Sequence, residues 1–171
     1  AGIIKQGTIV ISESQNPQVV EVLSKTAADK NAQIFFVSDE EIEAASHRKI
    51  GLLGTYQWEN AACALKTAEI LLKSKGISDE QIETITTQAL KQTVWPGRME
   101  VLSDKPFLLV DGAHNSNGVM ALKNSLEKLY PGEKFTFFMG VMADKDYQLM
   151  IDEILPLAKR FITVTPDSDR A

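Results

Sequence analysis

Asp111, His114 and Asn115 place a carboxylate, an imidazole and an amide within one five-residue segment. Four apolar residues, Phe107 to Val110, come directly before this segment and predict a strand that is buried on both faces. In parallel sheets, ligands bind at the carboxyl ends of the strands. The segment 111–115 therefore predicts a ligand site, in which Gly112 allows the backbone to turn sharply.

A helix is predicted immediately after this segment. Its apolar stripe consists of Val119, Leu122, Leu126 and Leu129. Asn115 or Ser116 is the expected N-cap, and the free amides of such a helix start attract anions, including phosphate. Each feature alone has a structural explanation, because Asp-Gly is a common turn and Asn or Ser a common cap. His114 favours a functional site, because a titratable side chain is an unusual choice for a simple connection.

The composition is that of a soluble globular protein, with 44% hydrophobic and 24% charged residues among 171. A net charge of −5 and the lack of a basic stripe argue against a nucleic-acid partner. No apolar run approaches the ~18 residues of a membrane-spanning helix, so we expect no membrane partner and a cytoplasmic location. One cysteine cannot form an internal disulfide, and one Cys with two His is too few for a typical zinc site.

The chain before residue 95 predicts a mixture of strands and helices. In chain order we expect a strand at 8–11, a helix opened by Asn16-Pro17, a strand at 34–37, a polar connection at 39–49 and a helix from Trp58 to Gly76. Ser78 with Gln81 three residues later forms a capping-box pattern, which predicts a further helix.

Trp95-Pro96-Gly97-Arg98 interrupts the helical pattern and predicts a domain boundary, which divides the chain into 1–94 and 95–171. Beyond it, strands and helices are expected to alternate, at 107–110, 116–130, 135–139, 147–159 and 161–164. Helices between buried strands predict right-handed crossovers in a parallel sheet, so the fold class is α/β. Phe135 and Phe138 are expected in its core.

Further polar groups lie at the ends of predicted elements: Asn60, Arg98 and the triplet Asp144-Lys145-Asp146. Fold rules place the triplet on the same sheet edge as Asp111 and His114. Structural explanations stay open, since Asn60 could cap a helix, Arg98 could form a surface ion pair and the triplet could be a solvated turn.

A Walker A phosphate loop is not found in this sequence. Gly2 and Gly7 have its glycine spacing, but Thr8 and Ile9 stand where the loop requires Lys and then Ser or Thr. Without that lysine, the chain by itself cannot grip a nucleoside triphosphate in the Walker A manner.

Four motifs occur together and in order. They are Leu-Leu-Gly-Thr-Tyr-Gln-Trp-Glu-Asn-Ala-Ala from Leu52, Trp-Pro-Gly-Arg-Met-Glu from Trp95, Asp-Gly-Ala-His-Asn from Asp111, and Gly-Val-Met-Ala-Asp-Lys-Asp from Gly140. This combination closely resembles the folylpolyglutamate synthases, often bifunctional with dihydrofolate synthase in bacteria, of the muramyl ligase superfamily. The resemblance covers essentially the whole chain.

The resemblance implies the end of a P-loop ATPase domain at 1–94, followed at 95–171 by the first part of a Rossmann-like C-terminal domain with a parallel sheet. It implies an ATP-dependent ligase that joins L-glutamate to the carboxylate of a folate or dihydropteroate through an acyl phosphate. ATP and Mg²⁺ are the implied cofactors, and the expected state is a monomer.

The resemblance also implies roles for particular residues. His114 and Asp111 would be catalytic, with His114 near the acyl phosphate and the entering glutamate. Asn60 would contact adenine, Arg98 the phosphates and Asp111 the ribose or nearby solvent. Asp144, Lys145 and Asp146 would line the cleft, and no metal ligand is expected within this chain.

The sequence departs from the family pattern in ways that bear on activity. The P-loop, the Mg²⁺ ligands and a carbamate-bearing lysine are expected before Ala1, and a β-rich stretch expected between Ile50 and Gly51 is lacking. The chain as written is therefore expected to be inactive. Two alternatives stay open: a ligase acting on a murein precursor, against which the Asp-Gly-Ala-His-Asn and Asp-Lys-Asp motifs argue, and a non-catalytic nucleotide-binding module.

Overall fold

The structure is a computed structural model that describes residues 1–13, 16–165 and 167. The chain forms two compact units, one built from residues 1–51 and 57–93 and the other from residues 52–56 and 94–171. None of the helices in the described residues is both long enough and apolar enough to cross a membrane.

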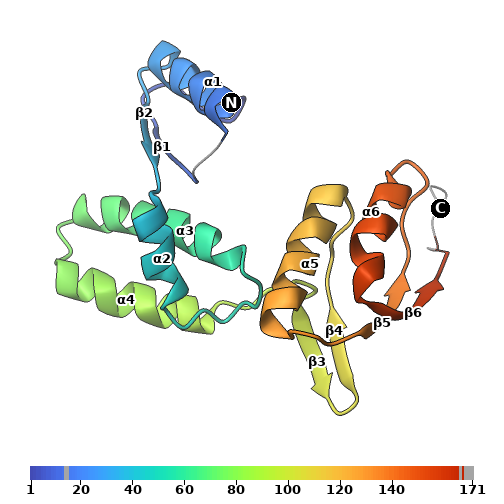
Figure 1. Ribbon diagram of the computed structural model, residues 1–171. Helices are drawn as coiled ribbons and strands as arrows, with labels where there is room; N and C mark the ends of the chain where they lie inside the picture. The colour runs from blue at the N-terminus through green and yellow to red at the C-terminus, as the bar shows by residue number, and fades with distance from the viewer. Residues whose placement is uncertain (14–15, 166, 168–171) are drawn as a thin grey trace. The chain divides into compact units, whose positions relative to one another are not determined.

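The first unit contains two parallel strands and four helices (Figure 1). Its elements are β1 (Ile9–Ser12), α1 (Pro17–Asp29), β2 (Gln33–Phe36), α2 (Asp39–Ser46), α3 (Gln57–Lys73) and α4 (Asp79–Gln92). β1 pairs in parallel with β2, and α1 connects them. The core is a cluster of Val37, Ala45, Ala61 and Ala62, against which Cys63 packs. α3 therefore buries small residues against α2.

Helix α2 corrects the prediction of a polar connection at 39–49. Ser38 accepts from the amide of Glu41, whose carboxylate accepts from the amide of Ser38, so a complete capping box opens this helix. Three acidic residues in the first turn also match the helix dipole. The predicted capping box of Ser78 and Gln81 is confirmed at the start of α4.

The second unit contains a β-hairpin followed by a βαβ crossover. Its elements are β3 (Glu100–Asp104), β4 (Phe107–Val110), α5 (Ser116–Leu129), β5 (Phe135–Met139), α6 (Tyr147–Ile154), a 3₁₀ turn (Leu155–Leu157) and β6 (Ala158–Thr163). β5 and β6 pair in parallel through α6, as the predicted α/β fold requires. In Figure 1, α5 and α6 lie side by side, and Val119 of α5 shares a core cluster with Met150 and Ile154 of α6.

Strand β4 differs from its prediction in two respects. It pairs antiparallel with β3, a strand that was not predicted, and within the described residues it has no second strand neighbour. It is also not buried on both faces, because Leu108 and Val110 are 48% and 39% exposed while Leu109 packs against the cluster of Met99, Leu126 and Leu157. A short apolar run does not by itself show which face of a strand is covered.

Two boundaries in the crossover also differ from expectation. The helix predicted at 147–159 ends at Ile154, because Pro156 lies in the 3₁₀ turn that follows, and β6 begins at Ala158.

Phe138, expected in the core, is 69% exposed. Burial alternates along β5, so Phe135 and Phe137 face the core and Phe138 faces the other way.

Candidate functional site

Asp111 stands at the carboxyl end of β4, as expected, and its carboxylate organises the segment after the strand. One oxygen, Oδ1, accepts from the amide of Ala113 at 2.8 Å. The other, Oδ2, accepts from the amide of Met99 at 2.9 Å. The half-buried carboxylate thus ties the loop after β4 to the turn that contains Arg98.

The His114 side chain is exposed, with Nδ1 lying 2.8 Å from the carbonyl oxygen of Gly112. A carbonyl can only accept, so Nδ1 carries the hydrogen in this contact. In the neutral imidazole, Nε2 then presents its lone pair to the outside. His114 is therefore available to accept a proton or a hydrogen bond from a ligand.

Asn115 is the N-cap of α5, and its Oδ1 accepts from the amide of Gly118 at 2.8 Å. This settles the predicted choice between Asn115 and Ser116. The helix start follows His114 directly, so the positive end of its dipole lies beside the imidazole in the chain.

The turn before β3 presents Arg98 to solvent. Gly97 and Met99 both have left-handed backbones, with φ of 71° and 45°. Met99 is 1% exposed and belongs to the core cluster with Leu126 and Leu157. Arg98 is exposed, and in the part of the chain that the structure describes its guanidinium forms no hydrogen bond or ion pair.

The turn and the loop after β4 approach closely. A Cβ placed on Gly112 would lie 3.4 Å from the carbonyl oxygen of Gly97. The structure therefore brings the backbone that carries Arg98 against the backbone that leads to His114. Both belong to the second unit.

The triplet Asp144-Lys145-Asp146 lies between β5 and α6. Asp146 is the N-cap of α6 and accepts from the amide of Leu149, while Lys145 is half-buried. Just before the triplet, Val141 packs on the same apolar cluster as Ala113. The loops after β4 and β5 thus pack on one apolar cluster, although in the described residues β4 and β5 belong to separate sheets and not to the single sheet edge that was expected.

Asn60 lies in the first unit, near the start of α3, where its side chain is exposed. Its Nδ2 donates to Oε1 of Gln57 at 3.0 Å. Gln57 is only 3% exposed, and its Nε2 has no hydrogen-bond partner among the described residues. The Asn60 amide is therefore oriented by a buried neighbour one helical turn away.

Comparison with known proteins shows which proteins this chain resembles. Residues 97–171 match the family described as Mur ligase, glutamate ligase domain. The chain is 28% identical over 193 residues to a folylpolyglutamate synthase from Lacticaseibacillus casei and to a dihydrofolate synthase/folylpolyglutamate synthase from Bacillus subtilis (strain 168). Each alignment covers 100% of this chain and 44% of the relative. The chain is thus similar to Mur ligases over residues 97–171 and to folylpolyglutamate synthases along its whole length.

Solved structures of folylpolyglutamate synthases share its fold. An FPGS–AMPPCP–folate complex matches with a TM-score of 0.79 and 26% identity over 96% of this chain and 44% of that one. The apo form of L. casei FPGS matches with a TM-score of 0.77 and 25% identity over 99% of this chain and 45% of that one. The chain thus spans less than half the length of these relatives.

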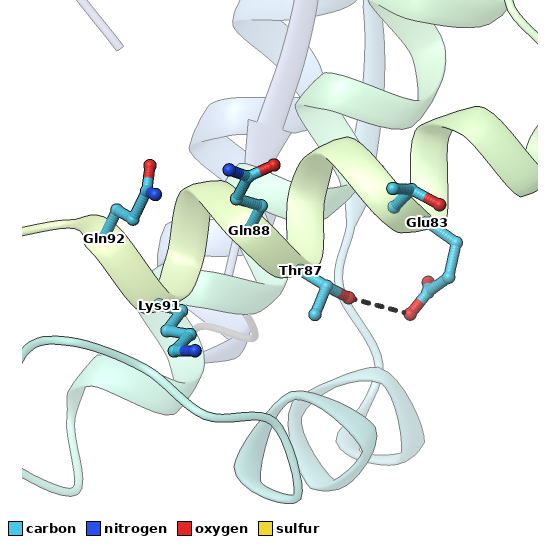
Figure 2. Close-up of a pocket in the computed structure, with 6 residues that line it drawn as sticks. Glu83, Thr87, Gln88, Lys91 and Gln92 are labelled. Carbon is cyan, nitrogen blue, oxygen red and sulfur yellow. Dashed lines mark hydrogen bonds between the residues drawn. The ribbon is translucent and has the colours of Figure 1, made fainter.

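Two hollows in the first unit are lined by residues that were not among the predicted site residues. The larger, about 600 Å³, lies along the exposed face of α4 (Figure 2). It is lined by Glu83, Thr84, Thr87, Gln88, Lys91 and Gln92. All come from one helix, and Thr87 already donates to Glu83 at 3.1 Å. Within the described residues, α4 alone lines this hollow.

The other hollow, about 300 Å³, lies among α2, α3 and α4 and holds paired charges. Arg48 pairs with Glu83 at 2.6 Å, Lys66 with Glu41 at 2.9 Å, and Lys73 with Asp79 at 3.0 Å. The hydrogen bond from Arg48 lowers the pKa of Glu83. Because each cation already has a carboxylate partner, these groups connect helices and leave no free charge for a ligand.

Two polar residues that contact a predicted site residue or its neighbour were not predicted to take part. Gln57 and Glu100 are polar residues at the first positions of α3 and β3. Gln57 precedes Asn60 by one helical turn, which could have signalled the contact. Glu100 accepts from the amide of Gly97 at 2.7 Å, a contact that depends on a strand that was not predicted.

Proposed function

We propose that this chain is part of an ATP-dependent ligase that joins L-glutamate to the carboxylate of a folate or dihydropteroate. The first unit would be the end of the ATPase domain, and the second the first part of the C-terminal ligase domain. The observation that carries the proposal is the exposed Arg98, which has no ion pair among the described residues and whose turn is hydrogen-bonded to Asp111 beside the His114 loop. The relatives bearing this function, and the AMPPCP and folate bound in one of them, support it.

The chemistry explains why such groups are needed. A carboxylate is a poor electrophile, so a phosphoryl group from ATP is first transferred to its oxygen, with release of ADP. The amine of glutamate then attacks the carbonyl carbon of the acyl phosphate, and phosphate leaves as the amide forms. Negative charge develops during both steps, and cationic groups stabilise it.

The residues present fit a polyphosphate and a reacting amine. Arg98 would bind the phosphates, because a planar guanidinium with no protein partner matches phosphate oxygens in bidentate geometry. His114 would accept a hydrogen bond or proton from the entering amine through Nε2. In the first unit Asn60 would contact adenine, and in the second unit Asp144, Lys145 and Asp146 would lie near the substrates.

Mg²⁺ would neutralise charge on the phosphates, held by ligands from sequence before Ala1. Folate or dihydropteroate and L-glutamate would be the partners, in a cytoplasmic monomer. Asp111 would lie near the ribose, at the edge where nucleotides bind in α/β sheets.

A phosphate-release assay on the full-length protein tests this function. ATP and Mg²⁺ are supplied with glutamate and either dihydropteroate or a reduced folate, and a murein-precursor substrate serves as the comparison. We expect phosphate release only when glutamate and a pteridine are both present. Release with the murein precursor alone would identify the other branch of the superfamily, and no release with any acceptor would reject the ligase.

A further inference from the structure

We infer that Asp111 and Glu100 are positioning residues that hold the turn at residues 97–99, the Arg98 turn, so that the Arg98 guanidinium points toward a phosphate chain. On this inference, Asp111 supports phosphate binding through the turn, in addition to the ribose contact proposed above. The inference rests on the proposed role of Arg98 in phosphate binding, and it assigns to Glu100 a role that its sequence pattern did not suggest.

The two amides that flank Arg98 both donate to carboxylates. The amide of Gly97 donates to Glu100 at 2.7 Å, and the amide of Met99 donates to Asp111 at 2.9 Å. Glu100 begins β3 and pairs in the hairpin with Val110, the residue before Asp111. Both carboxylates therefore stand at the same end of one hairpin, where its two strands fix their spacing.

The turn needs such a hold because its backbone is unfavourable. Met99 is a residue with a Cβ at φ 45°, in the left-handed region that side chains rarely adopt. Its side chain is anchored in the core, and its amide is anchored by Asp111. Because both the side chain and the amide of Met99 are held, the backbone of Arg98 is held as well. Only the side chain of Arg98 is then free to reorient.

The charges are arranged to leave the guanidinium free. Asp111 and Glu100 accept from the backbone on either side of Arg98, while no described residue forms an ion pair with the guanidinium itself. A carboxylate paired with Arg98 would compete with phosphate for it. Here the acidic groups strengthen the turn without occupying its cation.

Asp111 also links the turn to the catalytic loop. Its second oxygen accepts from Ala113, the residue before His114. Both carboxylate oxygens thus already have a backbone donor, and one side chain sets the position of Arg98 and of the His114 loop together. Loosening Asp111 should therefore disturb phosphate binding even for a ligand that has no ribose.

The test compares three ligands with three variants of the full-length protein. Dissociation constants are measured for ATP, inorganic tripolyphosphate, which lacks ribose, and adenosine, which lacks phosphate. Glu100→Gln weakens one charge-assisted hydrogen bond, whereas Asp111→Asn removes the charge from two and turns its amide nitrogen toward one of the two backbone donors. We expect about tenfold weaker binding of ATP and of tripolyphosphate in each variant, with adenosine binding unchanged in Glu100→Gln. Asp104→Asn, an exposed charge change elsewhere in β3, is the matched control and should change none of them.

The opposite ligand pattern overturns the inference. If Asp111→Asn weakens ATP and adenosine but leaves tripolyphosphate unchanged, Asp111 acts through the ribose. Hydrogen exchange provides an independent readout, since the Met99 amide should exchange faster in Asp111→Asn and at its normal rate in Asp104→Asn. If Asp111→Asn does not fold, Glu100→Gln decides alone, and unchanged tripolyphosphate binding in that variant rejects the inference.

Arg98→Ala separates failure of the inference from failure of the proposed function. We expect it to weaken ATP and tripolyphosphate, and we expect Asp111→Asn to add little in its presence because the two act as one unit. Unchanged affinity in Arg98→Ala would reject the phosphate role itself. Weaker binding in Arg98→Ala with normal binding in Asp111→Asn would reject only the positioning.

Discussion

The left-handed backbone at Met99 leads us to predict that glycine is tolerated there at least as well as alanine, the reverse of the usual order. Met99 is 1% exposed in the core cluster with Leu126 and Leu157, and its backbone is left-handed at φ 45°. Replacing a buried Met by Ala removes contacts and leaves a cavity, at a cost of roughly 2–5 kcal/mol. Met99→Ala should therefore destabilise the second unit by about 3 kcal/mol.

Met99→Gly removes one more carbon and would normally be worse. At this position glycine relieves the left-handed strain, which is worth about 1–2 kcal/mol for a residue with a Cβ. We therefore expect Met99→Gly to be as stable as Met99→Ala or more stable, despite the smaller side chain. Met120→Ala, a substitution of a 45% exposed Met on α5, is the matched control and should cost less than about 0.5 kcal/mol.

Native-state hydrogen exchange over α5 measures these differences within the second unit, because Leu126 of that helix contacts the same cluster. A loss below about 1 kcal/mol in Met99→Ala would refute the burial of this side chain. A glycine variant that is less stable than the alanine variant by about 1 kcal/mol, as at ordinary backbone positions, would refute the left-handed turn.

The remaining predictions concern the first unit. Ser78→Ala removes the capping box of α4 and should cost about 1 kcal/mol in urea unfolding, whereas the exposed Ser74→Ala, just after α3, should cost less; equal losses would contradict the cap. The pKa of Glu41 is lowered, first by its hydrogen bond from the Ser38 amide and then by Lys66. The stability that this carboxylate supplies is present above the unfolded value of about 4.3 and is lost as pH falls through the lower folded value. Glu41→Gln should flatten this acid dependence, and an unchanged pH profile of unfolding would show that the carboxylate plays no such part.

Much of the fold could be predicted from the sequence because local chemistry specifies it. Ser78 with Gln81 marks a helix start, and the structure places both side-chain contacts of that box there. The same logic applied to Ser38 with Glu41 would have found α2, but the acidic run around it was interpreted as solvated connection. Acidic residues in a first turn favour a helix, so an acidic run does not exclude one.

Strand pairing was harder to predict than helix starts. β3 contains Glu100, Ser103 and Asp104, and its polar character hid it. Without β3, β4 was placed in a parallel sheet and Glu100 was not recognised beside Arg98. Only two residues separate β3 from β4, so the polar residues of β3, and not distance along the chain, hid this pairing. Four apolar residues do not encode which edge or face of a strand is covered.

The position of the loop that carries Asp111, His114 and Asn115 was better predicted than the sheet that supports it. Asp111, His114 and Asn115 follow β4 as expected, and Asn115 caps α5. The contact from Asp111 to the amide of Met99 could not be predicted, because it requires the left-handed backbone at 99. Sequence patterns locate such groups along the chain, whereas their hydrogen-bond partners come from the folded backbone.

The central claim is that the exposed imidazole of His114 takes part in glutamate ligation. It is tested most directly by the rate of ATP- and glutamate-dependent folate extension in the full-length protein carrying His114→Ala. His47→Ala, which changes the other histidine of the chain at the exposed end of α2, is the control. We expect His114→Ala to lower the rate by about 100-fold or more with an unchanged unfolding temperature, and His47→Ala to leave it intact. Near-normal turnover in His114→Ala would contradict the account.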